Sequence, residues 1–226
     1  LSINNRDKLV TFIKIVAVIL LPLALLGIIE SVFKWHPYMS FRAYSLFRPD
    51  ANLLKDARFG LDRAFGPFGH SIMFGVSFLL FLPLVYSLRH ENGWKTKAYV
   101  LSFAILLGGL SSMSSGPWLM AIVIILCFFL EYHKTFVKPL LILFVTGCLL
   151  ISIISNRPFY FVLVSYLNPV GGGGWHRAKL LQCAINSFSE WCLLGYKGQD
   201  PGWGPQLGMT WTDVTNHFIL AGVNSG

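Results

Sequence analysis

Apolar residues in this chain are gathered into long uninterrupted runs, and short polar segments separate one run from the next. A helix needs roughly 20 apolar residues to cross a hydrocarbon core about 30 Å thick. Because the runs do not alternate apolar and polar positions, they predict helices and not the strands of a barrel. We therefore expect an all-α fold, a polytopic transmembrane helical bundle. Its expected spans cover about residues 9–29, 71–88, 98–110, 118–130 and 139–154, and the third and fourth must borrow flanking residues.

The segment after Ser155 does not continue as another span. Residues 159–167 predict a short apolar helix that lies in the interface or re-enters, and the glycines at 171–174 predict a flexible hinge. Residues 200–205 predict a loop, and Asp213 or Thr215 is the expected cap of a last helix. An amphipathic helix is predicted where apolar residues recur at helical spacing, at Ala178, Leu180, Leu181, Ala184, Ile185 and Phe188.

Domain organisation follows from these segments. We expect residues 1–226 to form a single membrane domain, an internal fragment of a longer protein, with a large extracytoplasmic helical loop at about 155–215. Among the four cysteines, Cys183 and Cys192 could pair in an oxidising compartment, but free thiols are the preferred interpretation.

Composition supports the membrane prediction and narrows the function. Hydrophobic residues make up 54% of the chain and charged residues only 12%, whereas about a quarter of a soluble domain is charged. The net charge is +8, but the basic residues are scattered between the apolar runs, so no nucleic-acid partner is expected. No ionisable residue lies near the centre of a run, which disfavours an ion-coupled transporter.

Basic residues also set the expected orientation. Three segments fall on one side of the membrane, and the positive-inside rule makes that side cytoplasmic. The segment at 30–70 is expected on the other side and carries six basic residues of its own, but it is long and also contains acidic residues. The basic residues of the three cytoplasmic segments are Arg6, Lys8 and Lys14, then Arg89, Lys95 and Lys97, then Lys134 and Lys138.

Four polar clusters would share the extracytoplasmic side, at residues 63–70, 111–118, 175–179 and 215–217. The second cluster places hydroxyls and free N–H groups at the start of a helix, which favours an anion. Each cluster also has an ordinary explanation. A boundary arginine binds lipid headgroups, a serine- and glycine-rich turn caps a helix, an interfacial histidine is structural, and tryptophans form an aromatic belt.

The order and spacing of the four clusters resemble the O-antigen ligase/polymerase membrane family. That family has an Arg…Gly…Phe-Gly-His-Pro-like segment, a Ser-Arg-Gly-x-Trp-like segment, an arginine-bearing helix that ends in a Pro-Leu-x-Gly-x-Gly-like turn, and an Asn-His-like element. The corresponding segments here are 63–75, 114–118, 177–198 and 216–217. The chain departs from the pattern at three places. Ser115 stands where the family often has arginine, and Ser71 stands where proline commonly follows the family's histidine. Residues 190–192 replace the family's usual proline.

The resemblance implies a metal-independent glycosyltransferase without a cofactor, a multi-pass protein of the bacterial inner membrane with an extracytoplasmic active face. Such an enzyme moves a glycan from a polyprenyl-diphosphate carrier to a hydroxyl on a glycan, a lipid core or a protein, as polymerase or ligase in surface polysaccharide assembly. Its partners are the donor, the acceptor and membrane lipid. The alternatives are a polysaccharide flippase or another non-enzymatic polytopic membrane protein.

Roles for individual residues follow from that chemistry. Arginine stabilises a diphosphate leaving group through charge-assisted hydrogen bonds worth about 1.5–3 kcal/mol each. A neutral histidine can accept the proton of the attacking hydroxyl. The expected catalytic residues are His217, Arg177 and Arg63, and the expected substrate-binding residues are His70 (also the second choice of base), Ser114, Lys179 and Asn216.

Overall fold

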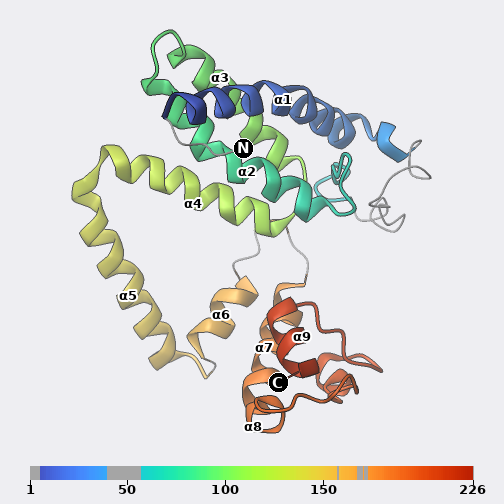
Figure 1. Cartoon of the computed structure of the whole chain (residues 1–226). Helices are drawn as coiled ribbons and strands as arrows, with labels where there is room; N and C mark the ends of the chain where they lie inside the picture. Colours follow the sequence, from blue (N-terminus) through green and yellow to red (C-terminus); the bar gives the residue numbers. More distant parts are fainter. Residues whose placement is uncertain (1–5, 40–56, 157, 167–169, 171–172, 226) are drawn as a thin grey trace. The chain divides into compact units, whose positions relative to one another are not determined.

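Helices are the regular secondary structure of the residues that the structure, a computed structural model, describes (Figure 1). These residues are 6–39, 57–156, 158–166, 170 and 173–225, and they contain no strand. The all-α prediction is therefore confirmed for this part of the chain. Two compact units, Leu1–Tyr132 and His133–Gly226, make up the chain, and each is described by itself.

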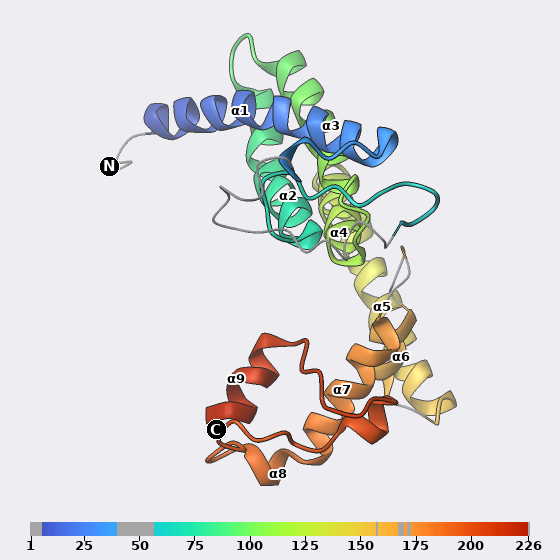
Figure 2. The same ribbon diagram turned by 90° about the vertical axis from the view of Figure 1, so that its right-hand side faces the viewer.

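The first unit contains four long helices: α1 (Arg6–Phe33), α2 (Ser71–Ser87), α3 (Lys95–Leu110) and α4 (Ser115–Tyr132). Helix α2 packs against the other three, and α1 also packs along α3 (Figure 2). Phe74, Phe78 and Leu79 of α2 are fully buried in the core that these helices share, together with Ile105 of α3. Helix α3 likewise packs against the other three, so α2 and α3 together form the centre of the unit.

Small residues allow these helices to approach closely. A Cβ atom on Gly108 of α3 would lie 2.7 Å from the Cβ of Ala24 in α1. A Cβ on Gly75 of α2 would lie 2.5 Å from the Oγ of Ser112. Small residues at helix crossings are typical of helices that associate in a membrane, where close backbone packing supplies much of the attraction.

Polar contacts at one end of the first unit tie together three segments. Arg6 at the start of α1 forms an ion pair of 3.0 Å with Glu91, which follows α2 and the short helix η3 (Leu88–His90). Arg89 forms an ion pair of 2.5 Å with Glu131 at the end of α4. The basic residues at the start of α1 and those between α2 and α3 therefore lie at the same end of the unit, as the sequence predicts.

The opposite end holds the other connections of this unit. The backbone N–H of Asp62 donates to the carbonyl of Ser31 at 3.1 Å, and the N–H of Ala64 donates to the carbonyl of Ser111 at 3.0 Å. These bonds place the segment before α2 beside the end of α1 and the turn between α3 and α4. The described part of the 30–70 segment and the 111–117 turn therefore lie at the same end of the unit, as the predicted topology requires.

Within the described residues, four helical segments are long and apolar enough to cross a membrane: Arg6–Phe33, Ser71–His90, Ser115–Tyr132 and Lys134–Ile154. The expected third span corresponds to α3, which has 16 residues. With 16 residues, α3 falls below the roughly 17–25 residues of a helix that spans a membrane. The expected fourth span is longer than predicted, because α4 begins at Ser115 and has 18 residues. Of the five expected spans, four have the required length.

The second unit begins with the apolar helix α5 (Val137–Ile154), which follows the short helix η4 (Lys134–Phe136) and has no buried residue. The other helices are short: α6 (Phe159–Tyr166), α7 (Gly174–Asn186), α8 (Phe188–Trp191), η5 (Gly204–Leu207) and α9 (His217–Ser225). A second core forms where α7, η5 and α9 meet, and its buried residues are Leu180, Cys183, Ala184, Trp203, Leu207, Ile219 and Val223.

Helix α7 confirms the predicted amphipathic helix but corrects its apolar face. Ala178, Leu180 and Ala184 are buried as expected, whereas Ile185 and Phe188 are exposed. For Phe188 the reason is that α7 ends at Asn186, so that Phe188 belongs to the separate helix α8. All four cysteines are free, in agreement with the preferred interpretation of the sequence.

The loop after α8 is closed by side chains. The hydroxyl of Thr212 accepts hydrogen bonds from the N–H groups of Trp203 at 2.9 Å and Gly204 at 3.1 Å. The carboxylate of Asp200 accepts from the N–H of Gly202 at 2.9 Å and from that of Thr212 at 3.1 Å. The predicted loop at 200–205 is confirmed as far as Trp203, where η5 follows.

Candidate functional site

Arg63 is a buried arginine at the end of the first unit that holds the 111–117 turn. Only 7% of its surface is exposed. Its Nη2 atom donates a hydrogen bond of 2.8 Å to the Oγ of Ser114, which is 1% exposed. The bond joins two of the predicted site residues, which stand 51 positions apart in the sequence.

Ser114 also contacts two other serines. The Oγ atoms of Ser71 and Ser114 lie 3.1 Å apart, and the Ser114 hydroxyl also donates to the carbonyl of Ser112 at 3.1 Å. Ser71 is the first residue of α2, and Ser114 directly precedes α4. Between the serines, Met113 has a φ of 44°, a left-handed conformation that disfavours a residue with a Cβ. Two helix starts therefore converge on the guanidinium of Arg63.

His70 caps α2. Its Nδ1 atom accepts a hydrogen bond of 3.1 Å from the backbone N–H of Ile72. A neutral imidazole that accepts through Nδ1 carries its proton on Nε2. In this arrangement the Nε2 of His70 is a hydrogen-bond donor, which suits substrate binding better than the alternative role as a base.

An apolar groove of about 280 Å³ lies at the same end of the first unit. Trp118 forms part of its wall and is fixed by a bond of 3.0 Å from its indole N–H to the carbonyl of Leu110. Ser111, whose carbonyl accepts from the N–H of Ala64, also lines the groove, so the groove borders the segment that carries Arg63. The remaining lining residues are Ile28, Ser31, Val32, Leu61, Leu107 and Met113.

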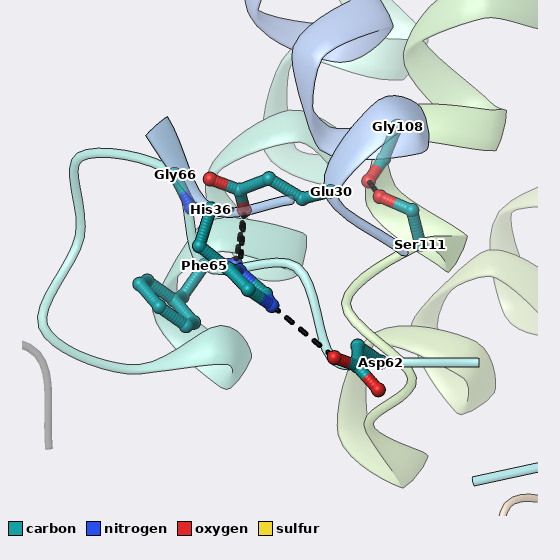
Figure 3. Close-up of polar contacts among 7 residues, drawn as sticks. All are labelled: Glu30, His36, Asp62, Phe65, Gly66, Gly108 and Ser111. Carbon is teal, nitrogen blue, oxygen red and sulfur yellow. Dashed lines mark hydrogen bonds and ion pairs between the residues drawn. The ribbon is translucent and has the colours of Figure 1, made fainter. Parts of the chain in front are cut away.

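Sequence reasoning missed a buried cluster of Glu30, His36 and Asp62 (Figure 3). Glu30 is fully buried, and its Oε2 accepts from the N–H of Phe65 at 3.1 Å and from that of Gly66 at 3.0 Å. The ring of His36 lies between two carboxylates, with Nδ1 3.9 Å from the Oε2 of Glu30 and Nε2 3.4 Å from the Oδ2 of Asp62.

The surroundings of His36 favour its charged form. The interaction with Glu30, followed by that with Asp62, raises the pKa of His36 above its ordinary value, against the opposing effect of burial. The ring also stacks on that of Phe65, with centroids 5.1 Å apart. The one sequence signal for this cluster was Glu30, an acidic residue at the end of an apolar run, but its partners lie too far along the chain for periodicity to reveal them.

The second unit holds the other predicted residues. Arg177 is exposed on α7 and forms no ion pair with any residue in the described part of the chain. Lys179 lies two positions further on, and its Nζ donates to the Oε1 of Gln182 at 3.4 Å. His176 Nε2 lies 3.3 Å from the carbonyl oxygen of Asp213, which holds the start of α7 beside the segment that leads into α9.

Asn216 caps α9. Its Oδ1 accepts from the N–H groups of Phe218 at 2.9 Å and Ile219 at 3.4 Å. The expectation that Asp213 or Thr215 caps this helix is wrong, because the chain enters the helix at His217. The side chain of His217 lies outside the described part of the structure. The structure thus brings Arg63, His70 and Ser114 to one end of the first unit, and α7 beside the segment before α9 in the second.

The described residues contain no group of three or more histidine, cysteine, aspartate or glutamate side chains arranged to hold a metal ion. Comparison of the chain with protein families, with curated proteins and with solved structures finds no match. Function is therefore inferred from the residues and their geometry.

Proposed function

We propose that the protein is a polytopic membrane glycosyltransferase that moves a glycan from a polyprenyl-diphosphate carrier to a hydroxyl acceptor, on the extracytoplasmic face of a bacterial inner membrane. The observation that carries the proposal is the bond of 2.8 Å between Arg63 and Ser114. It joins the two segments of the first unit on which the resemblance to the O-antigen ligase/polymerase family rests, although they are distant in the sequence.

Exposed apolar surface supports the membrane part of the proposal. Leu141, Ile142, Leu143 and Phe144 of α5 are all more than half exposed, and no residue of α5 is buried. Full burial of such a side chain is worth about 1.5–3 kcal/mol. A hydrocarbon environment removes the cost of exposing these side chains to water for every residue of the helix. The four apolar segments are also long enough to cross the hydrocarbon core of a membrane.

The orientation follows from the two ends of the first unit. The end with Arg6 and Arg89 also holds Lys14 and Lys97, whose ammonium groups lie 5.0 and 5.3 Å from the centre of the Trp94 ring. Basic residues collect on the cytoplasmic side of membrane proteins. The end with Arg63 and Ser114 is then extracytoplasmic, where a lipid-linked glycan is used.

The chemistry of the Arg63 end suits a diphosphate donor. The planar guanidinium can bind phosphate oxygens through two parallel hydrogen bonds. The Ser114 hydroxyl holds Arg63 in place, and the starts of α2 and α4 add the partial positive charge of helix N-termini. The neighbouring apolar groove accommodates part of the polyprenyl chain, so that lipid and diphosphate are held side by side.

The second unit carries the two other residues that the resemblance implies, Arg177 and His217. Arg177 is exposed, and its guanidinium suits a phosphate oxygen. His217 accepts the proton that the acceptor hydroxyl loses as its oxygen attacks C1 of the glycan, while the diphosphate leaves with the electron pair of the broken bond.

A transfer assay tests the proposal. The full-length protein is placed in liposomes with a polyprenyl-diphosphate-linked oligosaccharide and glycan, lipid-core and protein acceptors in turn, and new glycosidic bonds are measured by mass spectrometry. We expect transfer to one acceptor class, and its loss in Arg63→Ala, Arg177→Ala and His217→Ala. Lys34→Ala and Lys197→Ala, which remove exposed cations from the two units, are the matched controls and should retain transfer. Transport of the donor without bond formation, or full transfer by all three site variants, would contradict the proposal.

A further inference from the structure

The backbone around Arg63 is held on both sides by α1 and the residues that follow it. On one side, the N–H groups of Phe65 and Gly66 both donate to Glu30. On the other side, Asp62 contacts His36 through its carboxylate and donates its N–H to the carbonyl of Ser31. Arg63 lies between these two attachments, so its position depends on them.

The attachments depend on charge. Glu30 is 0% exposed, and the side chains of His36 and Asp62 are 7% and 14% exposed. With His36 protonated, one cation lies between two carboxylates; with His36 neutral, two buried negative charges face each other without it. Buried like charges repel strongly in a medium of low dielectric constant. The cluster therefore favours a protonated His36.

Two polar atoms of the cluster are not fixed by a hydrogen bond to any described residue. The Oε1 of Glu30 and the Nδ1 of His36 are buried, and neither has a hydrogen-bond partner among the described residues. The distance of 3.9 Å between His36 Nδ1 and Glu30 Oε2 is an ion-pair distance and is too long for a hydrogen bond. Toward Glu30 the histidine thus contributes through its charge, whereas its Nε2 is within hydrogen-bond distance, 3.4 Å, of the Oδ2 of Asp62. Tyr38 is a further titratable group near Glu30, and burial, followed by the charge of Glu30, raises the pKa of the Tyr38 phenol.

We propose that Glu30, His36 and Asp62 act as positioning residues, a clamp that holds the 62–66 backbone so that Arg63 reaches Ser114, and that the clamp opens when His36 loses its proton. The proposal deepens the proposed function, since it assigns the control of the phosphate-binding arginine to residues that do not touch substrate. The clamp itself is a property of the first unit and can be observed without any transfer reaction.

Hydrogen exchange of the full-length protein in lipid nanodiscs tests the clamp. The amides of Phe65 and Gly66 are followed between pH 5.5 and 9, after correction for the intrinsic effect of pH on exchange. We expect strong protection at low pH that is lost as the pH rises through the raised pKa of His36. Asp62→Asn removes one of the two carboxylates and should shift the midpoint to lower pH by about one unit, the usual effect of a neighbouring opposite charge.

Control variants make the result specific. Glu91→Gln removes a carboxylate at the opposite end of the same unit and should leave the midpoint unchanged. Asp62→Glu restores the charge and should restore the midpoint. Protection of Phe65 and Gly66 that is independent of pH, or an unchanged midpoint in Asp62→Asn, would overturn the clamp.

The transfer assay separates the two proposals. If the clamp controls Arg63, Asp62→Asn should transfer at nearly the wild-type rate at low pH and lose about tenfold at one pH unit above its own midpoint. An exchange midpoint without any transfer would support the clamp and contradict the proposed function. Transfer without an exchange midpoint would support the proposed function and contradict the clamp.

Discussion

Replacement of Gly108 by alanine tests the helix packing on which the site depends. The added Cβ would lie 2.7 Å from the Cβ and 2.9 Å from the Cα of Ala24, and 3.4 Å from the Cδ1 of Phe78. Because Ala24 Cα is backbone, no side-chain rotation can relieve the contact, and α1 must move away from α3. Such overpacking costs about 1–3 kcal/mol, and we expect the upper part of that range.

The gain in helix propensity works in the opposite direction. Alanine in place of glycine within a helix is worth about 1 kcal/mol, so the net destabilisation of Gly108→Ala is about 2 kcal/mol. The matched control is Gly116→Ala in α4, where the added Cβ meets no atom within 4 Å. We expect that variant to be neutral or slightly more stable than the wild type.

Thermal unfolding in detergent, followed by circular dichroism and by the loss of monodisperse protein, measures both variants. The two changes are chemically identical, so a difference between their midpoints reports the Gly108 contact alone. Equal stability of Gly108→Ala and Gly116→Ala would refute the close approach of α1 and α3 and, with it, the packing of the first unit.

Three further predictions concern the second unit. Thr212→Val leaves two buried N–H groups without an acceptor, at about 1–3 kcal/mol each, and should lower the thermal midpoint reported by tryptophan fluorescence, whereas Thr212→Ser should restore it. Hydrogen bonds with Thr212 and Gly202 hold the pKa of Asp200 below its ordinary value. The ionised Asp200 therefore stabilises the loop fully at pH values above the ordinary pKa, and the stabilisation is lost as the pH falls through the lowered pKa. Acid titration followed by tryptophan fluorescence should show this transition in the wild type and not in Asp200→Asn. Asn216→Ala should cost about 1 kcal/mol through loss of the cap, and Asn216→Asp should keep both stability and transfer if capping is its main role.

The helices and the two ends of the first unit were predictable because they depend on local properties. Long apolar runs specify helices whatever their partners, and the charges of short connections indicate which connections share a side. The ion pair between Arg6 and Glu91 and the backbone bond between Ala64 and Ser111 agree with that interpretation. The limits of α3 and α4 were less accessible, since the ends of a helix depend on turn geometry such as the left-handed Met113.

The details of the site depend on contacts between residues that are distant along the chain, and the sequence pattern does not show which of these residues meet. Glu30 and Gly66 are 36 positions apart, and His36 and Asp62 are 26 apart. Similarly, Asp213, Thr215 and Asn216 are all suitable capping residues, and the choice of Asn216 rests on the backbone path into α9. Residue types thus indicated where polar chemistry would gather, while their partners required the folded chain.

The contact between Arg63 and Ser114 also changes the meaning of the main departure from the family pattern. In the family that the sequence resembles, an arginine is common at the position of Ser115, and its absence removes a cation from the turn before α4. In this chain a guanidinium reaches the adjacent residue from another segment, at 2.8 Å from the Oγ of Ser114. Under the proposed function, the Arg63 guanidinium takes the place of an arginine in the turn itself as the cation that binds the anionic substrate. The chain would then depend on the Glu30, His36 and Asp62 clamp in a way that an arginine within the turn would not.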